Sequence, residues 1–264
     1  MKPGEKGELR DLRGLRDPRG TGGLVPPLAG FAALLLLWEL ASLALDMKAL
    51  PAPPAVFRAL PSGLARGLAG HAAASLVRVL AGLGISLAIA LAIGIPMGYS
   101  RRVDRFTRPL LYCAYPVPKL ALLPVVILLL GVGEAAKVTV VVLILVFPLL
   151  VATRDAVRAV PEEEYALFTT LRATFPQTLR HVILPASLPA LFSALRVSVG
   201  IAFSALFFTE TFGTDKGLGL YIMDAWMRLD YPHMYLGILV LALSGVLLFT
   251  AVDVLARRTA PWKT

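Results

Sequence analysis

The chain has 264 residues, of which 57% are hydrophobic and 16% charged, with a mean hydropathy of +0.75 and a formal net charge of +9. Soluble domains carry roughly 45–50% apolar and about 25% charged residues, and a soluble core of this length cannot bury so much apolar surface. The composition therefore excludes an ordinary soluble enzyme. It predicts an all-α membrane protein, since no alternating ten-residue pattern of the barrel type is present.

The chain begins with a basic, Gly- and Arg-rich segment over residues 1–23, which is too polar to fold alone and predicts a disordered cytoplasmic tail. Six apolar segments follow, and a membrane helix needs about 20 such residues to cross about 30 Å of hydrocarbon. Prolines interrupt the third and fourth segments, which predicts that both lie inside a bundle where neighbouring groups satisfy the freed carbonyls. The six predicted spans are Pro27–Leu45, Ser75–Tyr99, Pro109–Leu130, Val138–Ala152, Ser187–Thr209 and Met234–Ala256.

The basic residues predict the orientation of these spans. With a cytoplasmic N-terminus, most of the 26 lysines and arginines lie in cytoplasmic segments, and both termini are inside. Arg78 is among the few assigned to the outer side. This distribution explains the positive charge without nucleic acid, and no aromatic-interleaved basic patch is present. We expect a first span with an outer connection over 24–70, a transmembrane domain over 71–257, and a cytoplasmic tail over 258–264.

Two spans carry stripes of small residues, which let membrane helices approach closely. We interpret both stripes as packing surfaces of a compact bundle, suited also to self-association, rather than as transport residues. The stripe of the second span consists of Gly82, Ser86, Ala90, Gly94 and Gly98, and that of the fifth span includes Ala190, Ala194 and Ser198.

Three charged residues lie within or at the end of spans and are candidates for a translocation pathway. A charge at depth costs about 2.5–3.5 kcal/mol, so each needs a reason. Arg196 either faces an aqueous path for an anionic solute or pairs with backbone carbonyls or a carboxylate, and we favour the pairing. Lys119 is expected to extend to the cytoplasmic interface. Glu210 ends the fifth span on the outer side, where we expect it to contact water.

The chain carries no signature of an energy source or of catalysis. It has no G-x-x-x-x-G-K-[ST] phosphate loop, so we expect it to bind no ATP itself. It has neither the H-E-x-x-H nor the G-x-S-x-G motif, and its histidines have no metal-ligating neighbours, so no catalytic residue, metal site or cofactor is predicted. Energy for transport must come from a partner, or the protein is a carrier or channel.

A long cytoplasmic loop, over about residues 153–186, separates the fourth and fifth spans. Its length far exceeds a simple turn, and its helical pattern breaks at Pro161 and Pro176, which indicates a docking surface. The loop resembles the coupling loop of type I ABC importer permeases, E-A-A-x3-G-x9-I-x-L-P. Val182 takes the Ile position, and Leu184 and Pro185 complete the ending. By spacing, Ala166, Leu167 and Phe168 take the E-A-A positions and Arg172 takes the Gly position, so the centre of the motif is degenerate.

Further stretches, in the expected order, are similar to the nitrate/sulfonate/taurine branch of that family. The same resemblance makes an arginine at Arg196 a common feature of the branch, which weakens any claim that it selects the solute. The stretches are Leu50–Val56, Ser75–Gly82, Pro116–Pro124, Leu130–Lys137, Ala194–Gly200, Lys216–Leu220 and Ala260–Trp262.

The resemblance implies a permease subunit, in the bacterial plasma membrane, of an ATP-driven importer that takes up a small anion such as a sulfonate, taurine or nitrate. It implies a second permease copy, separate ATPase subunits that hold ATP and Mg, and an extracytoplasmic solute-binding protein. The implied coupling residues are Tyr165, Ala166, Leu167, Phe168, Arg172, Ala173, Arg180, Val182, Leu184 and Pro185.

The alternative is a self-sufficient secondary carrier or channel. Such proteins often show inverted repeats and intramembrane acids that couple ions to transport. We find no repeat between the halves and no acid deep in a predicted span. A membrane-embedded enzyme is disfavoured because no nucleophile or metal constellation is present.

Overall fold

The computed structural model describes residues 25–259, with side chains from residue 29 onward. The predicted N-terminal tail over 1–23 lies outside the described residues, as do residues 260–264. The described residues are helical and contain no strand, in agreement with the predicted all-α class. The chain divides into two compact units, with the division after Phe57.

The first unit contains the apolar helix α2 (Val25–Leu45), which matches the first predicted span, and most of α3 (Pro53–Arg58). The connection between them is held to α2 by two hydrogen bonds. The indole Nε1 of Trp38 donates to the carbonyl of Pro51 at 3.1 Å, and the hydroxyl of Ser42 donates to the carbonyl of Leu50 at 2.9 Å. These bonds satisfy two backbone carbonyls of the connection.

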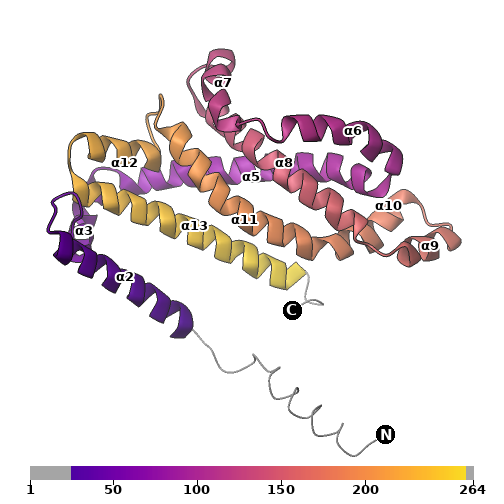
Figure 1. Ribbon diagram of the computed structural model, residues 1–264, viewed down its shortest axis with the longest axis horizontal. Helices are drawn as coiled ribbons and strands as arrows, with labels where there is room; N and C mark the ends of the chain where they lie inside the picture. Colours follow the sequence, from indigo (N-terminus) through magenta and orange to yellow (C-terminus); the bar gives the residue numbers. More distant parts are fainter. Residues whose placement is uncertain (1–24, 260–264) are drawn as a thin grey trace, which may run out of the picture. The chain divides into compact units, whose positions relative to one another are not determined.

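The second unit is a bundle in which the long helices α5, α8, α11 and α13 run side by side (Figure 1). Its core lies among α5, α8 and α11 and is built from buried aliphatic residues such as Val79, Val141, Leu145 and Leu206. Its helices are α4 (Leu60–Ala65), α5 (Leu68–Tyr99), α6 (Arg101–Ala114), η1 (Lys119–Leu122), α7 (Leu123–Leu130), α8 (Glu134–Arg158), α9 (Glu162–Thr170), α10 (Phe175–Thr178), η2 (Leu179–Ile183), α11 (Leu184–Glu210), α12 (Leu218–Met227) and α13 (Tyr231–Thr259).

The glycines of the second-span stripe face α8. A Cβ atom added to Gly82 would lie 2.5 Å from Cγ1 of Val141, and one added to Gly98 would lie 2.5 Å from Cβ of Val157. A Cβ atom added to Gly94 would lie 2.8 Å from Cβ of Thr153. The absence of side chains at these positions therefore sets the distance between α5 and α8.

The fifth-span stripe is buried over only part of its length. Ser198 is buried, Ala194 is half-buried, and Ala190 is exposed on the single chain. Against the other helices of this chain, packing through the stripe is therefore confined to the half of α11 that contains Ser198.

The third predicted span is broken, as its prolines predict. It corresponds to α6 followed by η1 and α7, which are bent by 77° at the break after Ala114. Pro116 and Pro118 occupy the break, where they remove backbone donors and disfavour helical conformation in the preceding residues. Over the described residues, four helices are long and apolar enough to cross a membrane, or five with this pair counted as one span, and Ala29–Leu45 is a shorter apolar helix.

The helices flanking the long loop extend into it. Helix α8 continues to Arg158 and α11 begins at Leu184, so the segment between them covers only residues 159–183 and is itself mostly helical. At the C-terminus, α13 continues to Thr259 and ends on Arg257 and Arg258, so the predicted tail from residue 258 begins within the helix. Basic residues in the last turn favour this helix end through the helix dipole.

Candidate functional site

The segment between α8 and α11 is anchored to the bundle by aromatic and aliphatic contacts. The hydroxyl of Tyr165 on α9 donates to the carbonyl of Val157 at 3.0 Å. Its ring packs edge-on against Tyr99 at the end of α5, 5.6 Å between centroids, and Tyr99 packs in turn against Phe175 at 5.3 Å. Burial raises the pKa of the Tyr165 hydroxyl, which keeps it a donor. Helix α9 is thus tied to the ends of both α5 and α8.

Helix α9 ends in a left-handed turn at Arg172. Arg172 has a φ of +51°, its N–H donates to the carbonyl of Thr169 at 3.0 Å, and the N–H of Ala173 donates to the carbonyl of Phe168 at 2.9 Å. This pair of bonds is the Schellman motif, in which the left-handed position is usually glycine. Arg172 stands at the Gly position of the coupling motif, so the backbone keeps the conformation that glycine favours although the side chain differs.

The predicted coupling residues fall into an exposed set and a buried set. Of the predicted residues, Leu167 is 58% exposed, and Leu171, which was not predicted and caps the end of α9, is 67% exposed. Two large apolar side chains so placed at one short helix suit a protein contact. The other exposed predicted residues are Ala166, Arg172 and Arg180. The remaining ones lie toward the bundle: Val182 is buried, and Tyr165, Phe168, Ala173, Leu184 and Pro185 are half-buried.

The segment passes into α11 without a loop. A capping box between Thr174 and Gln177 begins α10, and a π-helical turn, η2, carries the chain directly into α11. Ile183 in this turn is fully buried and packs with Ile95 and Val157. Isolated π-turns interrupt the regular helix ladder and are frequent at functional positions.

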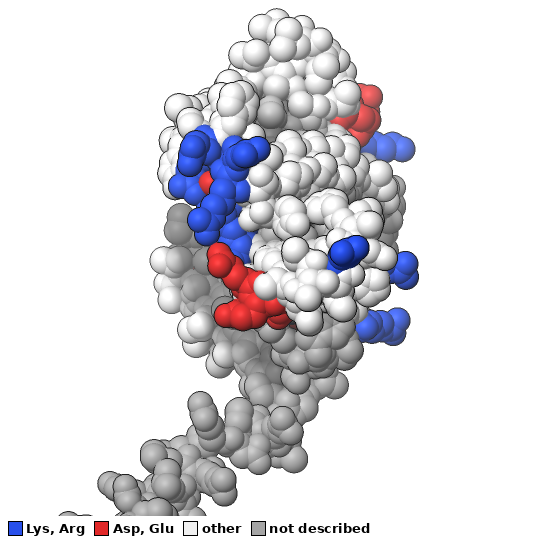
Figure 2. Space-filling model, turned by 90° about the vertical axis from the view of Figure 1, so that its right-hand side faces the viewer, with Lys and Arg blue, Asp and Glu red and all other residues white. Residues whose placement is uncertain are grey.

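The end of the molecule that carries α9 and α10 is strongly charged. Figure 2 views this end and shows basic side chains gathered beside an acidic group. The first turn of α9 supplies Glu162, Glu163 and Glu164, which favour a helix N-terminus through its dipole. Glu162 also pairs with Arg101 at 3.3 Å, where both side chains are exposed.

The three pathway candidates lie apart, each with its own partners. Arg196 forms an ion pair with Asp253 of α13, which is the carboxylate partner that the sequence favoured. Asp253 lies three residues from the end of the sixth predicted span, so it does not contradict the expectation of no acid deep in a span. Lys119 lies at the start of η1, where its Nζ donates to the carbonyl of Tyr115 and stands 4.4 Å from the ring centroid of Phe147.

The expectation that Glu210 contacts water is wrong. Glu210 has 0% exposure, and its carboxylate accepts hydrogen bonds from Arg78, from the hydroxyl of Ser75 at 2.8 Å and from the backbone N–H of Gly219 at 2.9 Å. Arg78, which the sequence counted among the basic residues of the outer side, lies buried on α5. Its guanidinium binds Glu134 through two bonds of 2.5 Å and donates to the carbonyl of Lys216 at 2.7 Å.

This charge network, in which Ser75, Arg78 and Glu210 are buried and Glu134 is exposed, was not predicted from the sequence. It joins α5, in its second and third turns, and the first turn of α8 to the end of α11 and to the connection that leads into α12. The available signal was an arginine inside a predicted apolar span, which requires a partner. The sequence did not say which of the acids supplies it.

Comparisons with known proteins agree with this architecture. Residues 82–262 match the family described as "Binding-protein-dependent transport system inner membrane component". The chain is 32% identical over 192 residues to the taurine transport system permease protein TauC of Escherichia coli, covering 73% of this chain and 70% of that protein. It is 29% identical over 238 residues to the formylaminopyrimidine transport permease protein ThiX of Halalkalibacterium halodurans, covering 90% and 95%. Other relatives are named as aliphatic sulfonate, bicarbonate and nitrate permeases.

A solved structure shares the fold. The MetNI methionine ABC transporter, in an inward-facing conformation, matches with a TM-score of 0.56 and 19% identity over 70% of this chain and 94% of that chain. The family match covers more than half of the chain, and the apolar helices and the helical segment before α11 fit it. The chain belongs to the family of inner-membrane permease components of binding-protein-dependent ABC importers.

Proposed function

We propose that this permease imports a small solute with an anionic group across a bacterial plasma membrane, with both termini in the cytoplasm. Two copies form the pathway, separate ATPase subunits hold ATP and Mg²⁺, and an extracytoplasmic binding protein delivers the solute. The names of the relatives support the solute class, since taurine, sulfonates, bicarbonate and nitrate all carry an anionic group. The formylaminopyrimidine relative shows that the family also handles other solutes.

The observation that carries the proposal is the architecture of α9 and α10. Helix α9 and its C-terminal end expose Leu167 and Leu171, while Tyr165 binds the helix to the ends of α5 and α8. A helix that is exposed on one side and anchored on the other can receive force from a partner and pass it to the bundle. We therefore assign α9 as the helix that an ATPase subunit contacts. Arg172 and Arg180 would form ion pairs with acidic groups of that subunit.

The structure offers a route for coupling. Movement of α9 acts on α5 and α8 through Tyr165, and on α11 through the continuous η2 turn. Helices α5, α8 and α11 share one packed core, so they respond together rather than singly. ATP-driven closure of the ATPase pair would in this way switch the bundle between inward- and outward-open states.

Orientation follows from the same assignment. If α9 is cytoplasmic, then Arg257 and Arg258 at the end of α13 are cytoplasmic as well, and the positive-inside rule is satisfied. The connection at 211–217 and helix α12 then face outward, toward the binding protein.

The test is ATP hydrolysis by the reconstituted complex, with and without the binding protein. The double substitution Leu167→Asp and Leu171→Asp should abolish the stimulation of ATP hydrolysis by the binding protein, because it removes both apolar side chains from the proposed contact with the ATPase. Glu163→Gln on the same helix is the matched control and should retain stimulation. Intact coupling in the double leucine variant, or solute uptake by the purified chain without an ATPase, would overturn the proposal.

A further inference from the structure

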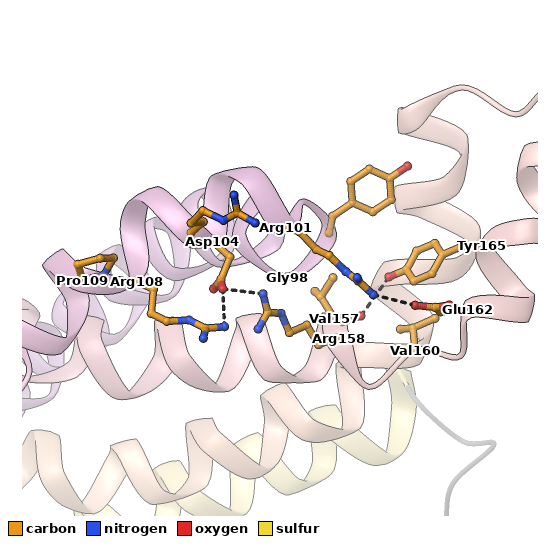
Figure 3. Close-up of a pocket in the computed structure, with 12 residues that line it drawn as sticks. Gly98, Arg101, Asp104, Arg108, Pro109, Val157, Arg158, Val160, Glu162 and Tyr165 are labelled. Carbon is orange, nitrogen blue, oxygen red and sulfur yellow. Dashed lines mark hydrogen bonds and ion pairs between the residues drawn. The ribbon is translucent and has the colours of Figure 1, made fainter.

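A cavity of about 630 Å³, lined by charged and apolar residues, lies between the start of α6 and the end of α8, next to α9 (Figure 3). Four arginines line it, Arg101, Arg105 and Arg108 from α6 and Arg158 from α8, against the two carboxylates Asp104 and Glu162. The cavity therefore keeps a net positive charge after every carboxylate that lines it is counted.

Asp104 organises this cavity. It is buried, and its Oδ2 lies 2.5 Å from Nη2 of Arg108 and 2.7 Å from Nη2 of Arg158. One carboxylate thus holds two guanidinium groups from two helices, and most of their ten N–H donors remain open. Arg105 adds a further cation, because no carboxylate of the described residues lies within 4.0 Å of it. The site is preorganised for an anion with several oxygens, such as a phosphate group.

The same seam between α6 and α8 becomes apolar beyond this cavity. A second hollow of about 220 Å³ is lined by Leu111, Tyr112, Tyr115, Pro116 and Val151, with Arg154 beside it. Exposed apolar side chains also stand on α6 among its arginines, with Phe106 79% exposed and Leu110 66% exposed. A cationic cavity followed by an apolar groove on one helix seam matches a molecule with a phosphate head and a hydrocarbon tail.

We propose that the α6–α8 seam binds an anionic phospholipid of the cytoplasmic leaflet, with its phosphate among Arg105, Arg108 and Arg158. The leaflet assignment rests on the proposed orientation of the permease. Anionic headgroups at that surface attract basic residues, by about five-fold in affinity for each arginine. Free phosphate would use the cavity alone and would leave the apolar groove without a role.

The experiment uses the only cysteine of the chain as a reporter. Cys113 is exposed on α6 and follows Tyr112 of the apolar hollow in the sequence, so a fluorophore attached there reports on lipid beside this helix. The full-length chain is reconstituted in bilayers that contain brominated phosphatidylglycerol or brominated phosphatidylcholine, at matched ionic strength. The ratio of quenching constants gives the preference for the anionic lipid, which we expect to be at least five-fold.

Two single substitutions separate a built site from general attraction to basic charge. Arg105→Gln should reduce the preference about five-fold, whereas Arg102→Gln should leave it unchanged. Arg102 is also exposed on α6 and carries the same charge, but it does not line the cavity. Arg105→Gln is not expected to disturb folding, since Arg105 is exposed and has no carboxylate partner among the described residues.

Three results would overturn the inference. An equal loss of the anionic-lipid preference in both variants would show that general surface charge, and not this cavity, attracts the lipid. Loss of the lipid preference when inorganic phosphate replaces chloride would show that the cavity takes free phosphate. Weaker association with the ATPase in Arg105→Gln, with unchanged lipid preference, would assign the cavity to the ATPase contact. None of these outcomes bears on whether the binding protein stimulates ATP hydrolysis, so the inference and the proposed function fail separately.

Discussion

Arg78 of α5 binds Glu210 at the end of α11, with 2.6 Å between Nη1 and Oε1, and both side chains are almost completely buried. The two residues are 132 positions apart in the chain. Their ion pair, with Glu134 on the other side of the guanidinium, joins three helices at the end of the bundle opposite α9. A buried pair of this kind is costly to form but far more costly to break, because the remaining charge is left without a partner.

Removing Glu210 should therefore destabilise the permease strongly. Glu210→Ala is expected to cost about 3–5 kcal/mol, because Arg78 and the N–H of Gly219 lose their acceptor. Glu134→Gln is the matched comparison and should cost less than about 1 kcal/mol, because the side chain of Glu134 is 67% exposed and water can replace it. Thermal unfolding of the purified protein in detergent measures both. Equal shifts in the midpoint for the two variants would contradict the assignment of Glu210 as the buried centre.

A second prediction concerns the left-handed turn at Arg172. A side chain in this conformation costs about 1–2 kcal/mol, so Arg172→Gly should stabilise α9 by about 1 kcal/mol after the entropy of the unfolded glycine is counted. Hydrogen exchange of the α9 amides is the measurement. Arg172→Ala removes the same charge but keeps the backbone cost, and it should give no such protection. The same gain in both variants would attribute the effect to charge rather than to backbone conformation.

Features that depend on neighbouring residues of the chain can be predicted from the sequence, whereas contacts between residues far apart in the chain cannot. Spacing of small residues is a local signal, so the stripe of Gly82, Gly94 and Gly98 on α5 could be read directly. The segment between α8 and α11 was predicted to be a docking surface from its length, and its resemblance to a coupling loop rests on the ending at Val182, Leu184 and Pro185. The bend after Ala114 was signalled by prolines, but its angle of 77° depends on packing against α8.

Ion pairs between distant helices could not be predicted with the same certainty. The pair between Arg196 and Asp253 was anticipated only as some carboxylate, and the network around Arg78 was not anticipated. In each case the sequence shows a charge that needs a partner, but only the packing of α5, α11 and α13 determines which one it meets.

The corner of the bundle that holds Asp230 should lose stability in acid. Burial alone would raise the pKa of Asp230, but hydrogen bonds from Arg66 and His233 outweigh it and hold the pKa below the ordinary 3.8. The folded chain then binds fewer protons than the unfolded chain at this residue. The stabilising contribution of the Asp230 carboxylate to the free energy of unfolding is complete above about pH 5. It is lost as the pH falls through the lowered pKa, near and below pH 4. Unfolding midpoints between pH 3 and pH 6 measure this loss.

The control for this acid dependence is Asp230→Asn. The variant keeps the shape of the side chain but cannot ionise, so the part of the slope near pH 4 that comes from Asp230 should disappear. Arg66→Gln should reduce the same slope, because it removes the first of the two hydrogen bonds that lower the pKa. An unchanged slope in Asp230→Asn would place the acid sensitivity elsewhere in the protein.

The last prediction tests the contact between α5 and α8. Gly82→Ala should destabilise the bundle by about 1–3 kcal/mol, because the new methyl group would lie 2.5 Å from Cγ1 of Val141 and the helices must separate. Gly84→Ala lies on the same helix, where a Cβ atom meets nothing within 4 Å, and should be neutral or stabilising by up to about 1 kcal/mol through helix propensity. Thermal unfolding compares the two variants. A destabilising Gly84→Ala together with a neutral Gly82→Ala would show that the opposite face of α5 carries the close contact, and the packing of α5 on α8 would have to be redrawn.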